Sequence, residues 1–432
     1  MGSMLYILLA LTVLVAFFIL MIFVPGNLNR VYIKYILLAY PLLAIDLLPS
    51  IISANIFCFT TIIFLIFFYK QNSLERSNKK SLYYFLFILL SVIVLGGLIN
   101  AENLTLTSIA YLIEYLSIFI FSCVLVGECE ADRKFVYQLV NCLKITLFVS
   151  LLFMIGQVFI GPSFTIAKSP NINVLSGISI RYTSFFQDPQ KYGQFLSACS
   201  FFFLIKTSDS RTRQFLNYCL LFFSILAIFM TGGRGALGGW LVAILFLILL
   251  GNAKYRLVLF FSIALLAIVA YNYSNSFAIF QRGADLTESY NFRYAIWQDA
   301  FHIFLDNPIW GIGIGNYANY VSVHNPDQYW IDDNVITFFD HPESGYLKLL
   351  TEYGAIGFLV ILLIILIPLY KGITLYFKSQ RSLQLILTAS VLTWLVGFYT
   401  VYSLGDIRIL ILIATIIGLM IADYKLTTNE VV

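Results

Sequence analysis

The chain consists largely of long apolar runs separated by short polar segments. Hydrophobic residues make up 60% of its 432 residues, charged residues only 11%, and the mean hydropathy is +0.89. A soluble domain carries about a quarter charged residues, so a soluble globular protein is excluded. In lipid, only helices and closed barrels satisfy the backbone, and barrel strands alternate apolar and polar residues. The sequence therefore predicts an all-α polytopic membrane protein.

Thirteen runs are candidate membrane spans, within an expected range of about 12–14 transmembrane helices. They are 4–24, 33–48, 51–69, 82–99, 105–127, 138–160, 190–206, 214–230, 236–250, 257–272, 345–370, 383–402 and 407–423. The first lacks a basic segment before its apolar run, so we expect a retained span and not a signal peptide. Residues 1–432 are predicted to form a single integral membrane domain.

Lysine and arginine are concentrated in the odd-numbered connections between these spans. Examples are Arg30 and Lys34 in the first, Arg133 and Lys134 in the fifth, and Lys371 and Arg381 in the eleventh. Positive charge accumulates on the cytoplasmic side of membrane proteins. We therefore expect the N-terminus outside, the C-terminus inside, and the segments 161–189, 231–235 and 273–344 at the outer face.

The segment 273–344 is a large, acidic outer loop that contains all three histidines of the chain, His302, His324 and His341. Within it, 289–305 has apolar residues near helical spacing, including Ile296 and Ile303. This pattern predicts a partly helical loop. The amphipathic helix is expected on the outer membrane surface or over a cavity.

Arginine and glycine stand together in the turn Thr231-Gly232-Gly233-Arg234-Gly235-Ala236. Glycines leave backbone N–H groups accessible, and a guanidinium is a permanently charged fork suited to phosphate. Arg234 is therefore a candidate phosphate-binding residue. A plain tight turn with an arginine at headgroup level is the alternative.

Two further arginines are predicted at the outer face. Arg293 lies on the amphipathic helix, where a solvated charge paired with a nearby acid is the alternative interpretation. Arg181 precedes Asp188-Pro189, a pattern typical of a helix start. Arg181, Gln187 and Lys191 can line a site, or can simply belong to the start of the next helix.

His341 combines a titratable side chain with a neighbouring carboxylate at the membrane boundary. Pro342 is predicted near the first helical position, with Glu343 at the positive helix end. Histidine titrates near neutral pH, so His341 is a candidate general base oriented by Glu343. Tyr346 follows in the same polar segment as a candidate substrate-lining residue, and Glu114 is the deepest ionisable group within a span.

Several other chemistries find no support in the sequence. No HxxxH or HExxH spacing is present, so no metal is expected. The pattern Gly311-Ile312-Gly313-Ile314-Gly315 lacks the βαβ context of a dinucleotide site. No cysteine lies in the outer loop, so no disulfide is expected. We also expect no cofactor and no nucleic-acid partner.

Four segments together resemble the O-antigen ligase and O-antigen polymerase superfamily. They are the Thr-Gly-Gly-Arg-Gly-Ala turn, the Arg293 helix, Asn307-Pro308-Ile309-Trp310-Gly311-Ile312-Gly313, and the run from His341-Pro342-Glu343-Ser344 to Gly357. The resemblance covers about residues 180–360, the expected superfamily core. It implies the architecture of C-type membrane glycosyltransferases.

The resemblance implies a metal-independent, inverting transfer of a glycan from undecaprenyl diphosphate to an acceptor hydroxyl. It places the protein in the bacterial inner membrane, multi-pass, with its active site facing the periplasm. Carried over by motif, Arg234 and Arg293 bind the diphosphate, Arg181 corresponds to a further basic residue, and His341 acts on the acceptor. His-Pro-Glu stands where ligases commonly have His-Asn, which leaves open whether Glu343 shares the role of base.

A polymerase that joins lipid-linked repeat units into O-antigen or capsular polysaccharide is preferred, because the His-Pro-Glu-Ser variant and the Phe- and Tyr-rich chain resemble polymerases. Its expected partners are lipid-linked donor and acceptor glycans, membrane lipid and a chain-length regulator protein. The alternative within the class is a ligase that transfers polymer to lipid A-core. A lipid-glycan flippase or transporter is a third hypothesis, disfavoured because the candidate arginines cluster at one face.

Overall fold

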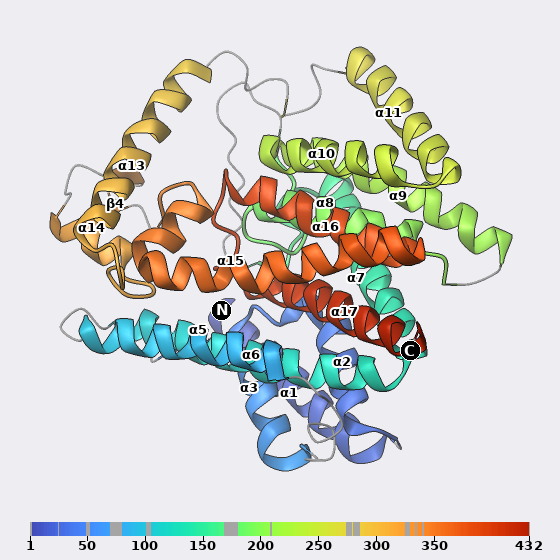
Figure 1. The fold of residues 1–432 in the computed structure, drawn as a ribbon. Coiled ribbons are helices and arrows are strands. Elements are labelled where there is room, and N and C mark those ends of the chain that lie inside the picture. Colours follow the sequence, from blue (N-terminus) through green and yellow to red (C-terminus); the bar gives the residue numbers. More distant parts are fainter. Residues whose placement is uncertain are drawn as a thin grey trace.

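The computed structural model is a bundle of apolar helices (Figure 1). It describes residues 2–24, 26–48, 52–69, 80–100, 105–167, 180–207, 210–273, 279, 286–324, 329–332, 335–338 and 341–431. In this part of the chain, five helices are long and apolar enough to cross a membrane, and shorter apolar helices pack among them. The predicted fold class, an all-α polytopic membrane protein, is confirmed.

The first half of the chain forms one group of helices. They are α1 (Gly2–Phe23), α2 (Leu28–Leu38), α3 (Ile56–Ile63) with its π-helical continuation η2 (Phe64–Phe68), α5 (Lys80–Ile99), α6 (Leu106–Ala131) and α7 (Arg133–Ile160). Helices α6 and α7 are two of the five long apolar helices. Asp132 separates them and caps α7 by accepting the N–H of Lys134.

The second and third expected spans differ from the structure at their outer ends. Helix α2 stops at Leu38, a 3-10 turn η1 (Tyr40–Leu42) contains Pro41, and β1 (Asp46–Leu48) pairs antiparallel with β2 (Ile52–Asn55). Proline has no N–H to continue the helical hydrogen bonds. The predicted helices 33–48 and 51–69 are therefore shorter than expected and joined by a β-hairpin.

The second half contributes α8 (Pro189–Ser200) with η4 (Phe201–Leu204), α9 (Arg211–Thr231), α10 (Arg234–Leu250), α11 (Ala253–Tyr273), α15 (Gly345–Ser379), α16 (Ser382–Phe398) and α17 (Ile407–Val431). Helix α10 packs on α16 within this half. The contact between α17 and α6 joins the two halves. At 35 residues, α15 is longer than a bilayer requires, and its backbone breaks at Gly354.

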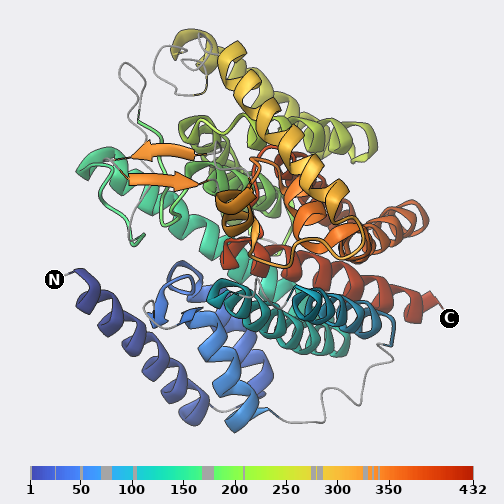
Figure 2. The same cartoon turned by 90° about the vertical axis from the view of Figure 1, so that its left-hand side faces the viewer.

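The expected large loop contains α13 (Leu286–Asp306), α14 (Tyr317–His324) and the ribbon of β3 (Tyr329–Asp332) with β4 (Val335–Phe338). Figure 1 shows α13 at one end of the bundle, steeply inclined to α15 and α17. Figure 2 looks onto that end and shows α13 and the β-ribbon there. We call it the loop end.

The apolar side of α13 packs against protein. Ile296, Ala300 and Ile303 are buried, and the last two form a small core with Tyr317 and Val321 of α14. Helix α13 also contacts α15. The expected amphipathic helix therefore exists, and its apolar residues fix it to the helix bundle. All six cysteines are free thiols.

Candidate active site

The turn between α9 and α10 presents Arg234 at the loop end. Helix α9 ends at Thr231, Gly232 has a left-handed backbone (φ 65°), and Gly233 is the N-cap of α10. The hydroxyl of Thr231 accepts the N–H of Gly233 at 3.2 Å, which closes the turn. Arg234 is exposed as the first residue of α10. Its guanidinium therefore lies at a helix N-terminus, where backbone N–H groups also favour anions.

Arg181 lies behind this turn. It is 5% exposed, and its Nε donates to the carbonyl of Thr231 at 2.9 Å. The backbone N–H of Tyr182 donates to the carbonyl of Met230 at 3.3 Å. Arg181 therefore braces the end of α9, whose last carbonyls have no helical partner. Its expected contact with a diphosphate stays a prediction.

The segment that carries Arg181 is fixed from two other helices. Gln157 of α7 accepts the N–H groups of Thr183 and Ser184 at 3.1 and 2.8 Å. Arg408 of α17 donates to the carbonyl of Phe185. Asp188 then caps α8 by accepting the N–H of Gln190, with Pro189 as the first helical residue. The predicted helix start at Asp188-Pro189 is confirmed.

Glu343 lies between His341 and Arg293. Its Oε1 is 3.7 Å from Nε2 of His341, and its Oε2 is 3.4 Å from Nη2 of Arg293. All three side chains are roughly a quarter exposed or less, so ligands can still reach them. Glu343 has a left-handed backbone (φ 49°), which is uncommon for residues other than glycine and concentrates at functional sites. Two segments 50 residues apart are joined through this carboxylate.

Arg293 also lies within electrostatic range of Arg234. Arg234 is partly desolvated, and the positive charge of Arg293 acts on it repulsively. Within the described residues Arg234 forms no ion pair, and Arg293 pairs with Glu343. Two guanidinium groups from separate helices therefore share one region of the loop end, where the carboxylate of Glu343 pairs with Arg293. Such an arrangement is suited to an anionic ligand that both arginines can contact.

His341 lies a few residues before the start of α15. The helix begins at Gly345 with Ser344 as N-cap, so Pro342 precedes the helix, and the prediction that Pro342 lies near its first position is wrong. Tyr346 donates its hydroxyl to the carbonyl of Leu395 at 2.7 Å. Its ring packs edge-on against Phe398 of α16, with centroids 5.2 Å apart. Tyr346 thus anchors α15 to α16, and its predicted contact with substrate stays a prediction.

A buried ion pair lies in the first turns of α15, close in sequence to His341 and Tyr346. Lys348 Nζ is 3.0 Å from Glu352 Oε1, and the two residues are 4% and 2% exposed. The same carboxylate accepts the N–H of Tyr317 at the start of α14. Lys348 also lies 5.1 Å from the ring centroid of Tyr402, whose ring is 6.4 Å from that of His341. Sequence reasoning missed these roles; the i,i+4 spacing of Lys348 and Glu352 in an apolar helix was the visible signal.

The two other predicted substrate-lining residues meet in a different place. Gln187 and Glu114 line a partly open cavity of about 250 Å³, which we call the polar cavity. It is bounded mainly by Asp46, Asn55, Glu114, Gln187, Lys191 and Asp406. Glu114 accepts a hydrogen bond from Asn55 Nδ2 at 2.6 Å. The structure therefore separates the predicted residues into the Arg234–Arg293–Glu343–His341 cluster and the polar cavity.

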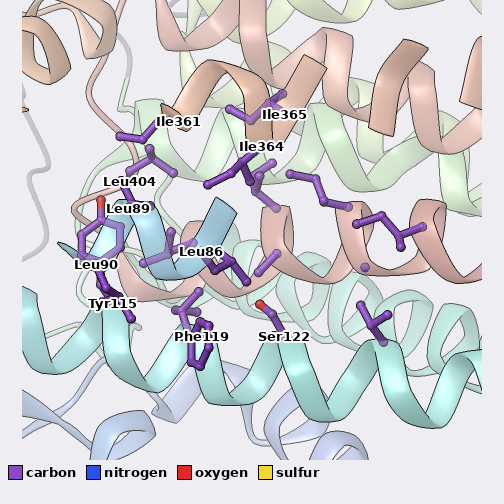
Figure 3. A pocket seen from close by; sticks show the side chains of 18 of the residues that line it. Leu86, Leu89, Leu90, Tyr115, Phe119, Ser122, Ile361, Ile364, Ile365 and Leu404 are labelled. Carbon is purple, nitrogen blue, oxygen red and sulfur yellow. The ribbon is translucent and has the colours of Figure 1, made fainter. Parts of the chain in front are cut away.

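A second cavity, of about 90 Å³, is almost wholly apolar and lies between α5, α6, α15 and α17 (Figure 3). We call it the apolar cavity; its lining includes Leu86, Leu89, Tyr115, Ile361, Ile365 and Leu404. Tyr115 lines it and accepts a hydrogen bond from the hydroxyl of Tyr353 at 2.9 Å. Three cysteine, histidine or carboxylate side chains that could hold a metal ion together do not occur among the described residues.

A family model described as O-antigen ligase matches residues 219–362. The matched region runs from within α9 to within α15 and includes Arg234, Arg293, His341 and Glu343, whereas Arg181 and Gln187 lie outside it. No curated protein matches the chain. The match supports the O-antigen ligase and polymerase superfamily, whose members are membrane enzymes that act on lipid-linked glycans in polysaccharide assembly.

Proposed function

We propose that this protein is a membrane glycosyltransferase that polymerises lipid-diphosphate-linked oligosaccharide repeat units at the periplasmic face of the bacterial inner membrane. The observation that carries the proposal is the cluster at the loop end, in which Arg234 and Arg293 share one region and Glu343 connects Arg293 to His341. The match of residues 219–362 to O-antigen ligases supports the same class of reaction.

The two arginines bind the diphosphate of the donor. As the bond between the anomeric carbon and the phosphate oxygen breaks, negative charge develops on the leaving diphosphate. Fixed guanidinium groups stabilise that charge without a proton transfer. The N-terminus of α10 adds backbone N–H groups on the side of Arg234.

His341 and Glu343 act on the acceptor. The acceptor hydroxyl attacks the anomeric carbon from the face opposite the leaving group, which inverts its configuration. The imidazole of His341 takes the hydroxyl proton as general base. The carboxylate of Glu343, 3.7 Å from Nε2 of His341, stabilises the imidazolium that forms. Undecaprenyl diphosphate leaves with both phosphates.

A polyprenyl tail needs apolar surface inside or beside the helix bundle. The apolar cavity between α5, α6, α15 and α17 offers leucine and isoleucine side chains (Figure 3). Its lining reaches Leu404, two residues after Tyr402, whose ring is near His341. In the proposed complex the proximal isoprene units enter this cavity, and the rest of the chain lies in the bilayer.

A ligase that transfers finished polymer to lipid A-core is the second candidate, favoured by the description of the matching family. A deletion strain distinguishes the two. Lipopolysaccharide that carries a single repeat unit identifies a polymerase. Rough lipopolysaccharide with accumulated lipid-linked polymer identifies a ligase.

Purified protein tests the enzymatic proposal directly. With lipid-linked repeat units as the substrate, we expect glycan chains to lengthen, and we expect Arg234→Ala, Arg293→Ala and His341→Ala to abolish this growth. The matched controls are Arg213→Ala, at the opposite end of α9 from the Arg234 turn, and His324→Ala in α14. Undiminished growth with all three folded site variants would overturn the proposed site.

A further inference from the structure

The polar cavity has a mostly polar lining, and the reaction proposed above assigns no role to the residues that line it. Its volume of about 250 Å³ far exceeds the roughly 10–15 Å³ that holds one water molecule. Its walls come from the β1–β2 hairpin, from α6, from the start of α8 and from the start of α17. Four separate elements therefore converge on one space.

The polar cavity lies next to the proposed active site. Gly233, in the turn that presents Arg234, packs against the backbone of Gln190, and the next residue, Lys191, lines the cavity. On another side, the ring of Tyr402 lies 6.4 Å from that of His341, and Gly405 of the same connection lines the cavity. The first turn of α8 and the connection between α16 and α17 thus form a shared wall.

The wall charges favour an uncharged ligand. Asp406 and Arg408 pair at 2.7 Å and neutralise each other. The carboxylates of Asp46 and Glu114 line the same cavity as the ammonium group of Lys191, so the lining has no excess of positive charge that would attract an anion. A second diphosphate is therefore disfavoured, and acidic sugars are disfavoured with it.

The hydrogen-bonding groups favour a polyhydroxylated ligand. The amide of Gln187 offers both donors and acceptors, the carboxylate of Glu114 can accept beyond its bond from Asn55, and Lys191 donates. A sugar hydroxyl both donates and accepts, so it matches such a mixed lining. Binding sites of this kind use a few placed polar groups to fix orientation.

We propose that the polar cavity binds an uncharged saccharide unit of the glycan substrate, on the far side of the shared wall from the diphosphate. The proposal rests on the glycosyltransferase function proposed above. The saccharide can belong to the donor or to the acceptor, and the two sources give different kinetic results.

The first experiment measures binding without the lipid diphosphate. The probe is the free oligosaccharide released by mild acid from the lipid-linked glycans of the strain that carries this chain. Its binding to the purified full chain is followed by saturation-transfer NMR at millimolar concentrations. Gln187→Ala and Lys191→Ala remove hydrogen-bonding groups, Ala110→Phe fills the cavity, and Gln298→Ala on α13 is the matched control outside it.

We expect Gln187→Ala and Lys191→Ala each to raise the dissociation constant about fivefold, as loss of one hydrogen bond does. Ala110→Phe should remove measurable binding, while Gln298→Ala and Arg234→Ala should leave it unchanged. The proposal is overturned if wild-type protein does not bind the oligosaccharide. It is also overturned if folded Gln187→Ala and Lys191→Ala proteins bind like wild type.

Single-round transfer, with donor and acceptor varied separately, identifies the source of the saccharide. A higher KM for the acceptor with unchanged donor KM in Gln187→Ala assigns the cavity to the acceptor, and the reverse assigns it to the donor. Unchanged values of both would contradict the proposal. Binding of farnesyl diphosphate tests the proposed function independently, since it should weaken in Arg234→Ala and persist in Gln187→Ala.

Discussion

Gly311 and Gly354 approach so closely that neither has room for a side chain. A Cβ added to Gly311 would lie 2.6 Å from the backbone nitrogen of Gly354, and one added to Gly354 would collide with the carbonyl of Ile309. Both residues have a left-handed backbone, with φ of 69° and 62°. The glycine-rich segment of the large loop is thereby inserted into the break in α15.

Backbone hydrogen bonds close this junction. The N–H of Ile312 donates to the carbonyl of Thr351 at 2.9 Å, and the N–H of Ala355 donates to the carbonyl of Pro308 at 2.8 Å. The junction fixes the end of α13 relative to the start of α15. Because α13 carries Arg293 and the residues before α15 include His341 and Glu343, the junction sets the geometry of the proposed active site.

Gly354→Ala should therefore separate the loop from α15. A left-handed backbone costs an alanine roughly 1–2 kcal/mol, and the collision adds to this. We expect a lower unfolding temperature and a large loss of glycan transfer. Gly238→Ala, in the helical α10 with no atom near its added Cβ, is the control and should be neutral or slightly stabilising. Equal thermal stability of the two variants would contradict the account of the junction.

The sequence predicts the helical membrane fold and the residues of the proposed site, but not this junction. Apolar runs are sufficient to place α6, α7, α15 and α17, because each repeats the signal over several turns. The junction joins backbone groups that are about 40 residues apart, and side-chain patterns carry little information on such contacts. The glycines at Gly311 and Gly354 are visible in the sequence, but their partners are not.

Other differences have similar physical causes. The break after α2 depends on how Tyr40 and Pro41 pack, since an apolar run that contains proline can be a helix or a turn. The prediction for Arg181 rests on its charge, its place ahead of Asp188-Pro189 and the family resemblance, and none of these distinguishes a ligand-binding arginine from one that braces a helix end. The polar cavity depends on four elements that meet only in the folded chain.

Arg234 provides a test of the proposed diphosphate site. Arg234→Ala should lower kcat/KM for the lipid-linked donor by at least a hundredfold, because a charge-assisted contact to the leaving group is lost. Arg234→Lys should retain only part of the wild-type kcat/KM, since an ammonium group cannot form a bidentate contact. Arg213→Ala, an exposed arginine at the other end of α9, should leave transfer unchanged. Full activity of Arg234→Lys would argue that simple charge is sufficient.

His341 and Glu343 should contribute unequally. His341→Ala removes the proposed base and should lower kcat by about 10²–10⁴. Glu343→Gln keeps the shape but removes the charge next to His341 and Arg293, so a smaller decrease of about tenfold is expected. The control is His324→Ala, because this exposed imidazole stacks on Tyr320 away from the site cluster. If Glu343→Gln is the more damaging change, the carboxylate is the better candidate for the base.

Lys348 and Glu352 should stabilise the folded protein only when both side chains are present. Lys348→Met leaves the Glu352 carboxylate buried without its cation and should cost roughly 3–5 kcal/mol of unfolding free energy. Glu352→Gln alone leaves the lysine without its anion. The double variant should be less destabilised than the sum of the two, because neither charge remains buried. Unfolding curves in detergent for all four proteins measure this coupling, and simple additivity would show that the two side chains act independently.

The pH dependence of stability should include Asp406, in the connection between α16 and α17. Burial by itself would raise the pKa of its carboxyl, but the Arg408 guanidinium holds that pKa below its usual range. A lowered folded-state pKa means that stabilisation is present above the unfolded pKa of about 4 and is lost as the pH falls through the folded value. Wild-type protein should therefore lose stability as the pH is lowered below about 4.

Asp406→Asn removes this titration and leaves Arg408 buried without its carboxylate. At pH 7 the variant should be less stable than wild type by roughly 3–5 kcal/mol. Below about pH 4 the difference in unfolding free energy between the two proteins should become smaller, because protonation makes the wild-type carboxyl neutral as well. Thermal unfolding in detergent across this range measures both curves, with Asp299→Asn on α13 as the control. A gap of constant size down to the lowest pH would show that the charge of Asp406 does not stabilise the fold.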